Sequence, residues 1–160
     1  MKRASLFLFV LVAAGNAGPP LGAADRSDER DILEAVFRQQ VAELLDDETR
    51  ARGVVLCLAH DPGDAPQSVD KELLVRFKGE ASVRRAAECE VRAGRVAEIA
   101  TGRPGVLVTA GPIETVAADE AWVTVVQRWS RGHSYKKAYR VVREPARWIS
   151  LGPIFKGSPS

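Results

Sequence analysis

Two runs of β-forming residues separated by a single tight turn constrain the fold of this chain most strongly. The runs cover residues 121–129 and 134–143, and residues 130–133 between them read Ser-Arg-Gly-His. Alternating β-branched, aromatic and polar residues favour a half-buried strand, and a short connection that contains glycine favours an antiparallel hairpin. A third run at 147–152 follows the turn at 144–146. The carboxyl-terminal third therefore predicts an antiparallel meander with one packed face.

Two segments upstream predict helices that can pack on this sheet. From Ser27 to Asp46, apolar residues recur at intervals of three and four, which favours a helix with one buried stripe. Acidic residues in its first turn suit the positive end of the helix dipole. Ser68 can cap a short second helix that ends near Phe77. The apolar positions of the first helix are Ile32, Leu33, Val36, Phe37, Val41, Leu44 and Leu45.

Shorter apolar runs between these segments predict further strands. Residues 53–60 contain a continuous apolar run, which is typical of a short buried strand. Residues 81–104 predict one or two strands, and residues 106–116 predict a strand that bends at Gly111-Pro112, because proline cannot donate to an interior ladder. The expected fold class is α+β, with an amino-terminal amphipathic helix and a short second helix packed on a curved antiparallel sheet of about five strands.

Residues 1–24 have the pattern of a secretory signal peptide. Lys2 and Arg3 precede an apolar run that is shorter than the roughly 18 residues of a membrane span, and small residues follow it. We expect cleavage between Ala17 and Ala24, a periplasmic or secreted location and no membrane span after cleavage. The alternative is a retained anchor.

Cys57 and Cys89 are the two cysteines of the chain. An even count in an oxidising compartment favours a disulfide, and two cysteines allow only one pairing. The alternative is two buried free thiols. We expect the bond within one α+β domain at 25–160, with a frayed tail at 156–160. No zinc spacing and no nucleotide or phosphate motif occurs in the sequence, so neither a metal nor a cofactor is expected.

Charge is uneven along the chain. The formal net charge of +2 falls to zero once the two cations of the leader are removed. Residues 25–70 are rich in acids, whereas residues 126–160 contain Glu144 as their only acid among many bases. A neutral exported chain is a poor candidate for binding nucleic acid. The basic end is either a surface for an anionic ligand or partner, or a solvated charged face.

The basic hairpin combines these cations with aromatic rings. Arginine forks bind carboxylates and phosphates, and tyrosine rings stack on planar groups. Because successive strand residues point to opposite faces, the side chains cannot all line one pocket. The alternative is an edge strand that its charges protect against aggregation. The candidate ligand-binding residues are Arg128, Arg131, Tyr135, Lys137, Tyr139 and Arg140, with His133 and Arg143 close to them.

His60 and Asp61 form a candidate pair of general base and orienting acid. Adjacent residues on an extended strand point to opposite faces, so the pair must lie on a bend to cooperate. The alternative is a histidine at a strand end and an aspartate in a turn. His133 is a second candidate general base.

The predicted order is an amphipathic helix, a short second helix and then antiparallel strands that end with residues 140–149. This order resembles the curved sheet and helix of the cystatin-like and nuclear-transport-factor-2-like superfamilies. The resemblance covers most of residues 27–155, although Pro145 stands where a glycine is more usual. Such folds often form a cone whose mouth binds a small ligand or peptide, and the fold alone does not imply a function.

We therefore expect an exported, non-catalytic binding module for a peptide, a partner protein or a small anionic ligand. One alternative is an enzyme of the nuclear-transport-factor-2-like kind that uses His60 or His133 as general base. Another is a cystatin-like peptidase inhibitor, but the sequence lacks an inhibitory Gln-x-Val-x-Gly motif.

Overall fold

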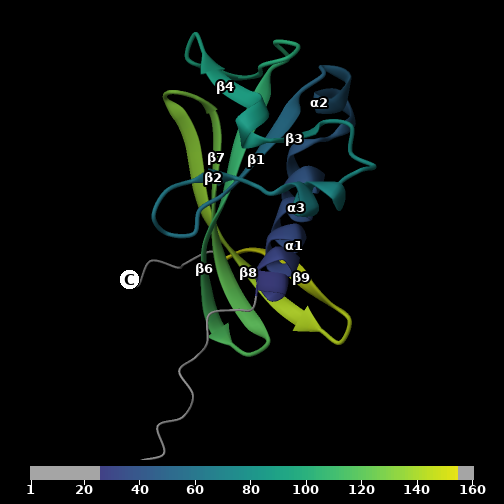
Figure 1. Cartoon of the computed structure of the whole chain (residues 1–160), viewed down its shortest axis with the longest axis vertical. Coiled ribbons are helices and arrows are strands. Elements are labelled where there is room, and N and C mark those ends of the chain that lie inside the picture. The colour runs from purple at the N-terminus through teal and green to yellow at the C-terminus, as the bar shows by residue number, and fades with distance from the viewer. Residues whose placement is uncertain (1–25, 155–160) are drawn as a thin grey trace, which may run out of the picture.

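A long helix lies in the concavity of a strongly curled sheet (Figure 1). The computed structural model describes residues 26–154, so the predicted signal peptide and the predicted frayed tail lie outside the described residues. No helix in this range is long and apolar enough to cross a membrane. The elements are α1 (Arg26–Leu44), α2 (Asp47–Ala51), β1 (Val55–His60), β2 (Gln67–Ser68), α3 (Lys71–Val75), β3 (Val83–Arg85), η1 (Ala86–Glu88), β4 (Cys89–Arg92), β5 (Arg95–Glu98), β6 (Gly105–Ala117), β7 (Glu120–Ser130), β8 (His133–Glu144) and β9 (Arg147–Ile154).

The sheet that residues 26–154 form has nine strands and is mixed. Strands β6 to β9 form the predicted antiparallel meander and add one long strand to it. Strand β1 runs parallel to β6, from Val55 beside Gly105 to His60 beside Ala110, and parallel to β3 on its other edge. A helix on a curved sheet is confirmed, whereas the prediction of about five antiparallel strands is wrong. Parallel neighbours need a long connection, and local alternation does not reveal that pairing.

Helix α1 buries its predicted apolar stripe against the concave face of the sheet. Ile32, Val36 and Phe37 are fully buried between the helix and the strands. The helix ends at Leu44 rather than at Asp46, because the Asp46 side chain accepts a hydrogen bond from the backbone N–H of Thr49 and caps α2.

The second predicted helix is shorter than expected and begins later. Asp70 caps α3 by accepting the backbone N–H of Leu73 at 2.7 Å, and this bond lowers the pKa of Asp70. Ser68, the predicted cap, instead pairs with Ala59 in the short strand β2.

The predicted bend in β6 is a shift of register against β7 between Ala110 and Ile113. The φ angle of Gly111 is +120°, and a Cβ atom there would lie 2.1 Å from the backbone oxygen of Asp61. Only glycine tolerates this conformation and this approach of a second backbone. The chain that leaves β1 therefore passes against β6 at Gly111.

The hairpin of β4 and β5 adds a second, smaller core on the opposite face of β1. Val55, Cys57 and Val96 are buried there, and Leu107 packs against them. The predicted disulfide between Cys57 and Cys89 is present and joins β1 to the start of β4. This bond holds the hairpin on the sheet.

Candidate functional site

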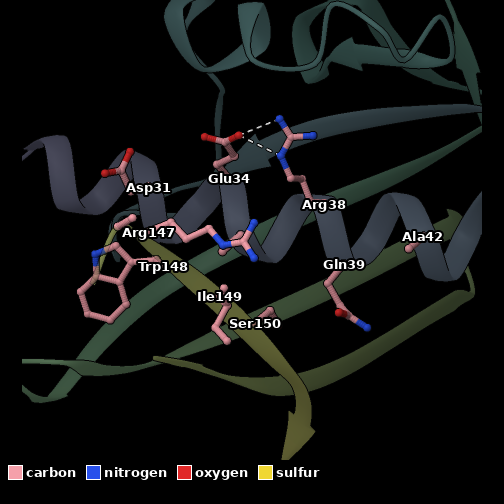
Figure 2. Close-up of a pocket in the computed structure, with 11 residues that line it drawn as sticks. Asp31, Glu34, Arg38, Gln39, Ala42, Arg147, Trp148, Ile149 and Ser150 are labelled. Atoms are coloured by element: carbon pink, nitrogen blue, oxygen red, sulfur yellow. Dashed lines mark hydrogen bonds and ion pairs between the residues drawn. The ribbon is translucent and has the colours of Figure 1, made fainter. Parts of the chain in front are cut away.

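A groove with a cavity volume of about 760 Å³ lies between α1 and β9. We call it the α1–β9 groove. Figure 2 shows Ile149 and Ser150 of β9 beside the flank of α1 that carries Gln39. The helix contributes side chains at intervals of three and four, so they form one stripe beside its buried face. The groove is lined by Asp31, Glu34, Ala35, Arg38, Gln39, Ala42, Ala146, Arg147, Trp148, Ile149 and Ser150.

The groove runs along the free edge of β9. Within the described chain this strand pairs with β8 alone. Five consecutive residues, 146–150, line the groove. A cavity on the face of a strand would be lined by alternate residues, because side chains alternate between faces. Consecutive residues indicate a cavity along the strand edge.

The backbone of β9 presents hydrogen-bonding groups at this edge. Glu144 and Arg147 form the pair that closes a two-residue turn. The pair of Val142 and Ile149 lies two positions further along the ladder of β8 and β9. Hydrogen-bonded pairs alternate along an antiparallel ladder, so Trp148 and Ser150 direct their N–H and C=O groups away from β8. An exposed row of such groups is a template for another strand.

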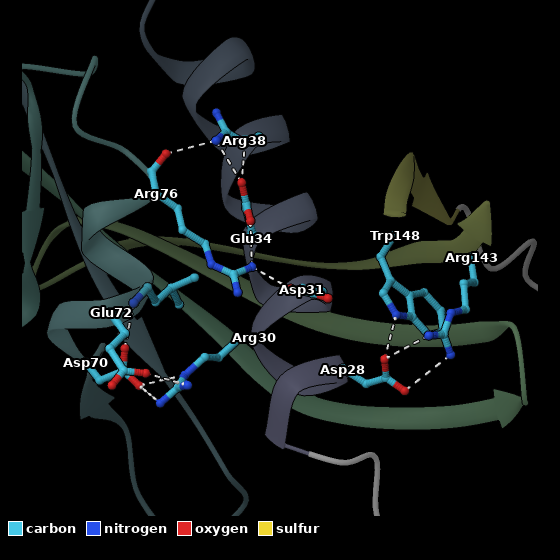
Figure 3. Close-up of polar contacts among 11 residues, drawn as sticks. Asp28, Arg30, Asp31, Glu34, Arg38, Asp70, Glu72, Arg76, Arg143 and Trp148 are labelled. Carbon is cyan, nitrogen blue, oxygen red and sulfur yellow. Dashed lines mark hydrogen bonds and ion pairs between the residues drawn. The ribbon is translucent and has the colours of Figure 1, made fainter. Parts of the chain in front are cut away.

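Ion pairs neutralise the charged side chains on the helix flank of the groove. Arg38 bonds to Glu34 at 2.7 Å, and Arg76 of the neighbouring turn also bonds to Glu34 at 2.7 Å (Figure 3). Hydrogen bonds to Asp31 and Glu34 raise the pKa of Arg76. Arg147 at the mouth is mostly exposed and lies 3.8 Å from Glu144. The groove therefore has balanced charge, which suits an uncharged chain segment better than an ion.

Asp28 holds one end of the groove in place. It accepts a hydrogen bond from the Trp148 indole Nε1 at 3.5 Å and lies 3.4 Å from Arg143 (Figure 3). The Arg143 guanidinium lies 5.7 Å from the centre of the Trp148 ring. These contacts fix the Trp148 ring, which is buried, as an end wall of the groove.

The predicted hairpin residues do not form one site. Tyr139 is fully buried and donates a hydrogen bond from its hydroxyl to Glu43 at 2.8 Å, and burial raises the pKa of Tyr139 to about 12. Arg140 forms two hydrogen bonds with Glu120, and Lys137 is exposed. Tyr139 and Arg140 therefore have partners inside the protein, so the ligand role predicted for them has no support in their contacts.

The remaining hairpin candidates lie around the turn between β7 and β8. His133 and Tyr135 line a second cavity with Trp129, and Arg131 donates its backbone N–H to the Gly94 oxygen at 2.8 Å. Arg128 is exposed on β7. The turn of β7 and β8 is thus joined to the turn of β4 and β5.

His60 and Asp61 do not act on each other. Asp61 accepts the backbone N–H of Gly63 at 2.9 Å, which is the turn role weighed as the alternative. The Nε2 atom of His60 lies 3.3 Å from the Glu29 carboxylate, and both residues line a cavity of about 390 Å³. Sequence reasoning missed Glu29, because it lies on α1 and only the fold brings it to the end of β1. No cluster of three or more metal-ligating residues occurs between residues 26 and 154.

The α1–β9 groove was also missed from the sequence. The one signal was the stripe of small and polar residues on α1, which includes Ala35, Gln39 and Ala42. That spacing shows a shared helix face but not what lies opposite it.

Comparisons with known proteins show no match: no family model, no curated protein and no solved structure is similar to this chain. The resemblance to the cystatin-like and nuclear-transport-factor-2-like superfamilies stays a prediction.

Proposed function

We propose that this chain is an exported, non-catalytic binding module that takes an extended peptide segment of a partner protein into the α1–β9 groove. The observation that carries the proposal is the run of five consecutive residues, 146–150, which leads from the turn into β9 and lies opposite one face of a helix. Extended peptides add to exposed sheet edges through backbone hydrogen bonds, and flanking pockets select alternate side chains.

The chemistry of the groove supports a peptide with few charges. Its charged side chains already have partners, and Ala35, Ala42 and Ile149 supply small or apolar surface. Gln39 donates its side-chain amide to Glu43 at 2.8 Å. The affinity would then come mainly from main-chain hydrogen bonds to Trp148 and Ser150 and from contact with the apolar surface.

The predicted compartment is part of the same proposal. A disulfide between Cys57 and Cys89 is compatible with a periplasmic or secreted protein, since disulfides persist in oxidising compartments. The leader pattern of residues 1–24 supports the same location.

A display library of random decapeptides tests the proposal. Selected peptides are titrated by fluorescence anisotropy against wild type, Ser150→Pro and the matched control Ser150→Ala. Proline removes the outward N–H of Ser150 without touching the pairing of β9 with β8, whereas alanine keeps that N–H. We expect about tenfold weaker binding or more for proline and a small effect for alanine, as for the loss of one hydrogen bond at a tight strand edge.

A second variant tests the groove independently if Ser150→Pro does not fold. Ala42 is exposed on α1 and lines the groove, so Ala42→Trp fills the groove with little risk to the core. Loss of binding in Ala42→Trp supports the groove. Unchanged binding in both variants, or failure to select any saturable peptide, contradicts the proposal.

The pair of His60 and Glu29 favours the second candidate function, an enzyme with His60 as general base. A carboxylate 3.3 Å from an imidazole nitrogen in a cavity is the geometry that orients such a base. A panel of ester, amide and lyase substrates, compared between wild type and His60→Gln, tests it. Turnover that the variant lacks would establish the enzyme, whereas the binding module predicts no turnover that depends on His60.

A further inference from the structure

A second cavity of about 490 Å³ lies where the turn of β7 and β8 meets the hairpin of β4 and β5. We call it the tip pocket. Among the described residues, it shares no lining residue with the α1–β9 groove. Its size falls within the range of pockets that hold small ligands, and most of its lining is apolar or aromatic. Its main lining residues are Arg95, Val96, Pro104, Trp129, His133 and Tyr135.

Aromatic rings form the wall of the tip pocket. The rings of Trp129 and Tyr135 are perpendicular, with centroids 5.7 Å apart, and the His133 ring is tilted 6.3 Å from that of Tyr135. Tyr135 is 55% exposed, so part of its ring is open to a ligand. A planar ligand can contact the edge of one ring and the face of another.

Arginines without an anionic partner surround the same turns. Arg92, Arg95, Arg128 and Arg131 are exposed, and none forms an ion pair with a residue between 26 and 154. Arginines elsewhere on the meander are neutralised: Arg140 pairs with Glu120 and Arg143 with Asp28. The arginines of the hairpin that form no ion pair within the described residues therefore lie at its turn, whereas the exposed Lys136 and Lys137 lie further along β8.

Backbone contacts join the two turns that lie beside the pocket. Arg95 pairs with Ser130 across β5 and β7, and the N–H of Arg131 donates to the Gly94 oxygen. Arg95 itself lines the cavity. A guanidinium fork at the rim of an apolar cavity suits a carboxylate, sulfonate or phosphate whose body enters the cavity.

We propose that the tip pocket binds a small aromatic anion, with its ring against Trp129 and Tyr135 and its anionic group on Arg95. This site is independent of the peptide groove, so either proposal can fail alone. A solvated basic turn explains the exposed arginines but not the placement of Arg95 in the lining of an aromatic cavity. The two explanations differ in whether binding depends on one arginine or on total charge.

The test is a titration with 2-naphthoate followed by NMR of ¹⁵N-labelled protein, which also reports the fold of each variant. We expect saturable shifts of the Trp129 indole and of the backbone around Tyr135. Arg95→Gln should weaken binding about tenfold, the loss expected for a charge-assisted hydrogen bond. Arg92→Gln, which removes the same charge outside the pocket, should change it less than about twofold, since exposed charges are screened by salt.

Two further measurements separate the explanations. Tyr135→Ala, a substitution at an exposed position, should weaken binding although it removes no charge. The cation 2-naphthylmethylammonium should not bind. Equal losses in Arg92→Gln and Arg95→Gln, binding of the cation as tight as that of naphthoate, shifts confined to the α1–β9 groove, or no saturable shifts would each overturn the proposal.

Discussion

Replacing Glu98 with glutamine is expected to destabilise the protein at the β4–β5 hairpin, by an amount that shrinks as the pH falls below 4.5. Glu98 is 4% exposed. Its carboxylate accepts hydrogen bonds from Arg84, from Thr101 and, at 3.0 Å, from Arg103. Glutamine keeps the size of the side chain but loses the charge and one acceptor. Two guanidinium groups then lose their anion at the base of the β4–β5 hairpin.

The magnitude follows from the pKa of Glu98. Hydrogen bonds from Thr101, Arg103 and Arg84 lower this pKa from 4.5 to about 2. That difference corresponds to an upper limit of about 3 kcal/mol of folding stability. Glutamine retains one carbonyl oxygen as acceptor, so we expect a loss of about 2 kcal/mol at pH 7.

The stabilisation by Glu98 decreases as the pH falls. The pKa of Glu98 is lower in the folded state, so its stabilisation is complete above the unfolded pKa of 4.5 and is lost as the pH falls toward 2. The difference between wild type and Glu98→Gln should therefore shrink to less than half at pH 3, by the same linkage.

Urea unfolding of both proteins at pH 7, 4 and 3 measures this difference. Glu90→Gln is the matched control, because Glu90 lies on the same hairpin, is exposed and forms no ion pair within residues 26–154. The control should stay within about 0.5 kcal/mol of wild type, as surface substitutions usually do. Equal stability of Glu98→Gln and wild type at pH 7, or a loss that persists undiminished at pH 3, would refute the reasoning.

Two other substitutions test the fold. Replacing Cys57 and Cys89 by serine should cost about 3 to 4 kcal/mol in urea unfolding, because the bond closes a long loop and Cys57 is buried; a cost below about 1 kcal/mol would contradict this. Gly111→Ala should cost more than about 2 kcal/mol by thermal unfolding, since its Cβ would meet the Asp61 oxygen at 2.1 Å. A melting temperature equal to that of wild type would show that the backbone there adjusts freely.

Local patterns explain which parts of the fold were predictable. The stripe from Ile32 to Leu45 and the alternation of Val123 and Val125 in β7 are set by residues close in sequence, and both were confirmed by their burial. The parallel pairing of β1 with β6 joins two strands that residues 61–104 separate in the sequence. Strands β2 and β3 are too short to show an alternating pattern of burial. The number and direction of strands therefore required the structure.

The depth of burial along one strand was not predictable either. Tyr135 and Tyr139 lie at alternate positions of β8 and share a face by parity, yet Tyr139 is fully buried and Tyr135 is 55% exposed. Alternation gives the face of a residue but not which part of that face α1 covers. For this reason the sequence could not separate the buried tyrosine from the exposed one among the candidate ligand residues.

The candidate sites also divide into those set by the local sequence and those set by long-range contacts. Cys57 and Cys89 were predictable because two cysteines have one pairing. The partner of His60 was not, because Asp61 is adjacent in sequence whereas Glu29 is adjacent only in space. The α1–β9 groove depends on where the helix crosses the sheet, which no local pattern records.

Amide hydrogen exchange of β9 in the presence of a selected decapeptide tests the central claim most directly. Strand addition predicts that the N–H groups of Trp148 and Ser150 exchange more slowly in the complex, since the peptide backbone bonds to them. The N–H of Ile149, which already bonds to β8, should change little. Saturating peptide that leaves the exchange of Trp148 and Ser150 unchanged would contradict binding along the free edge of β9.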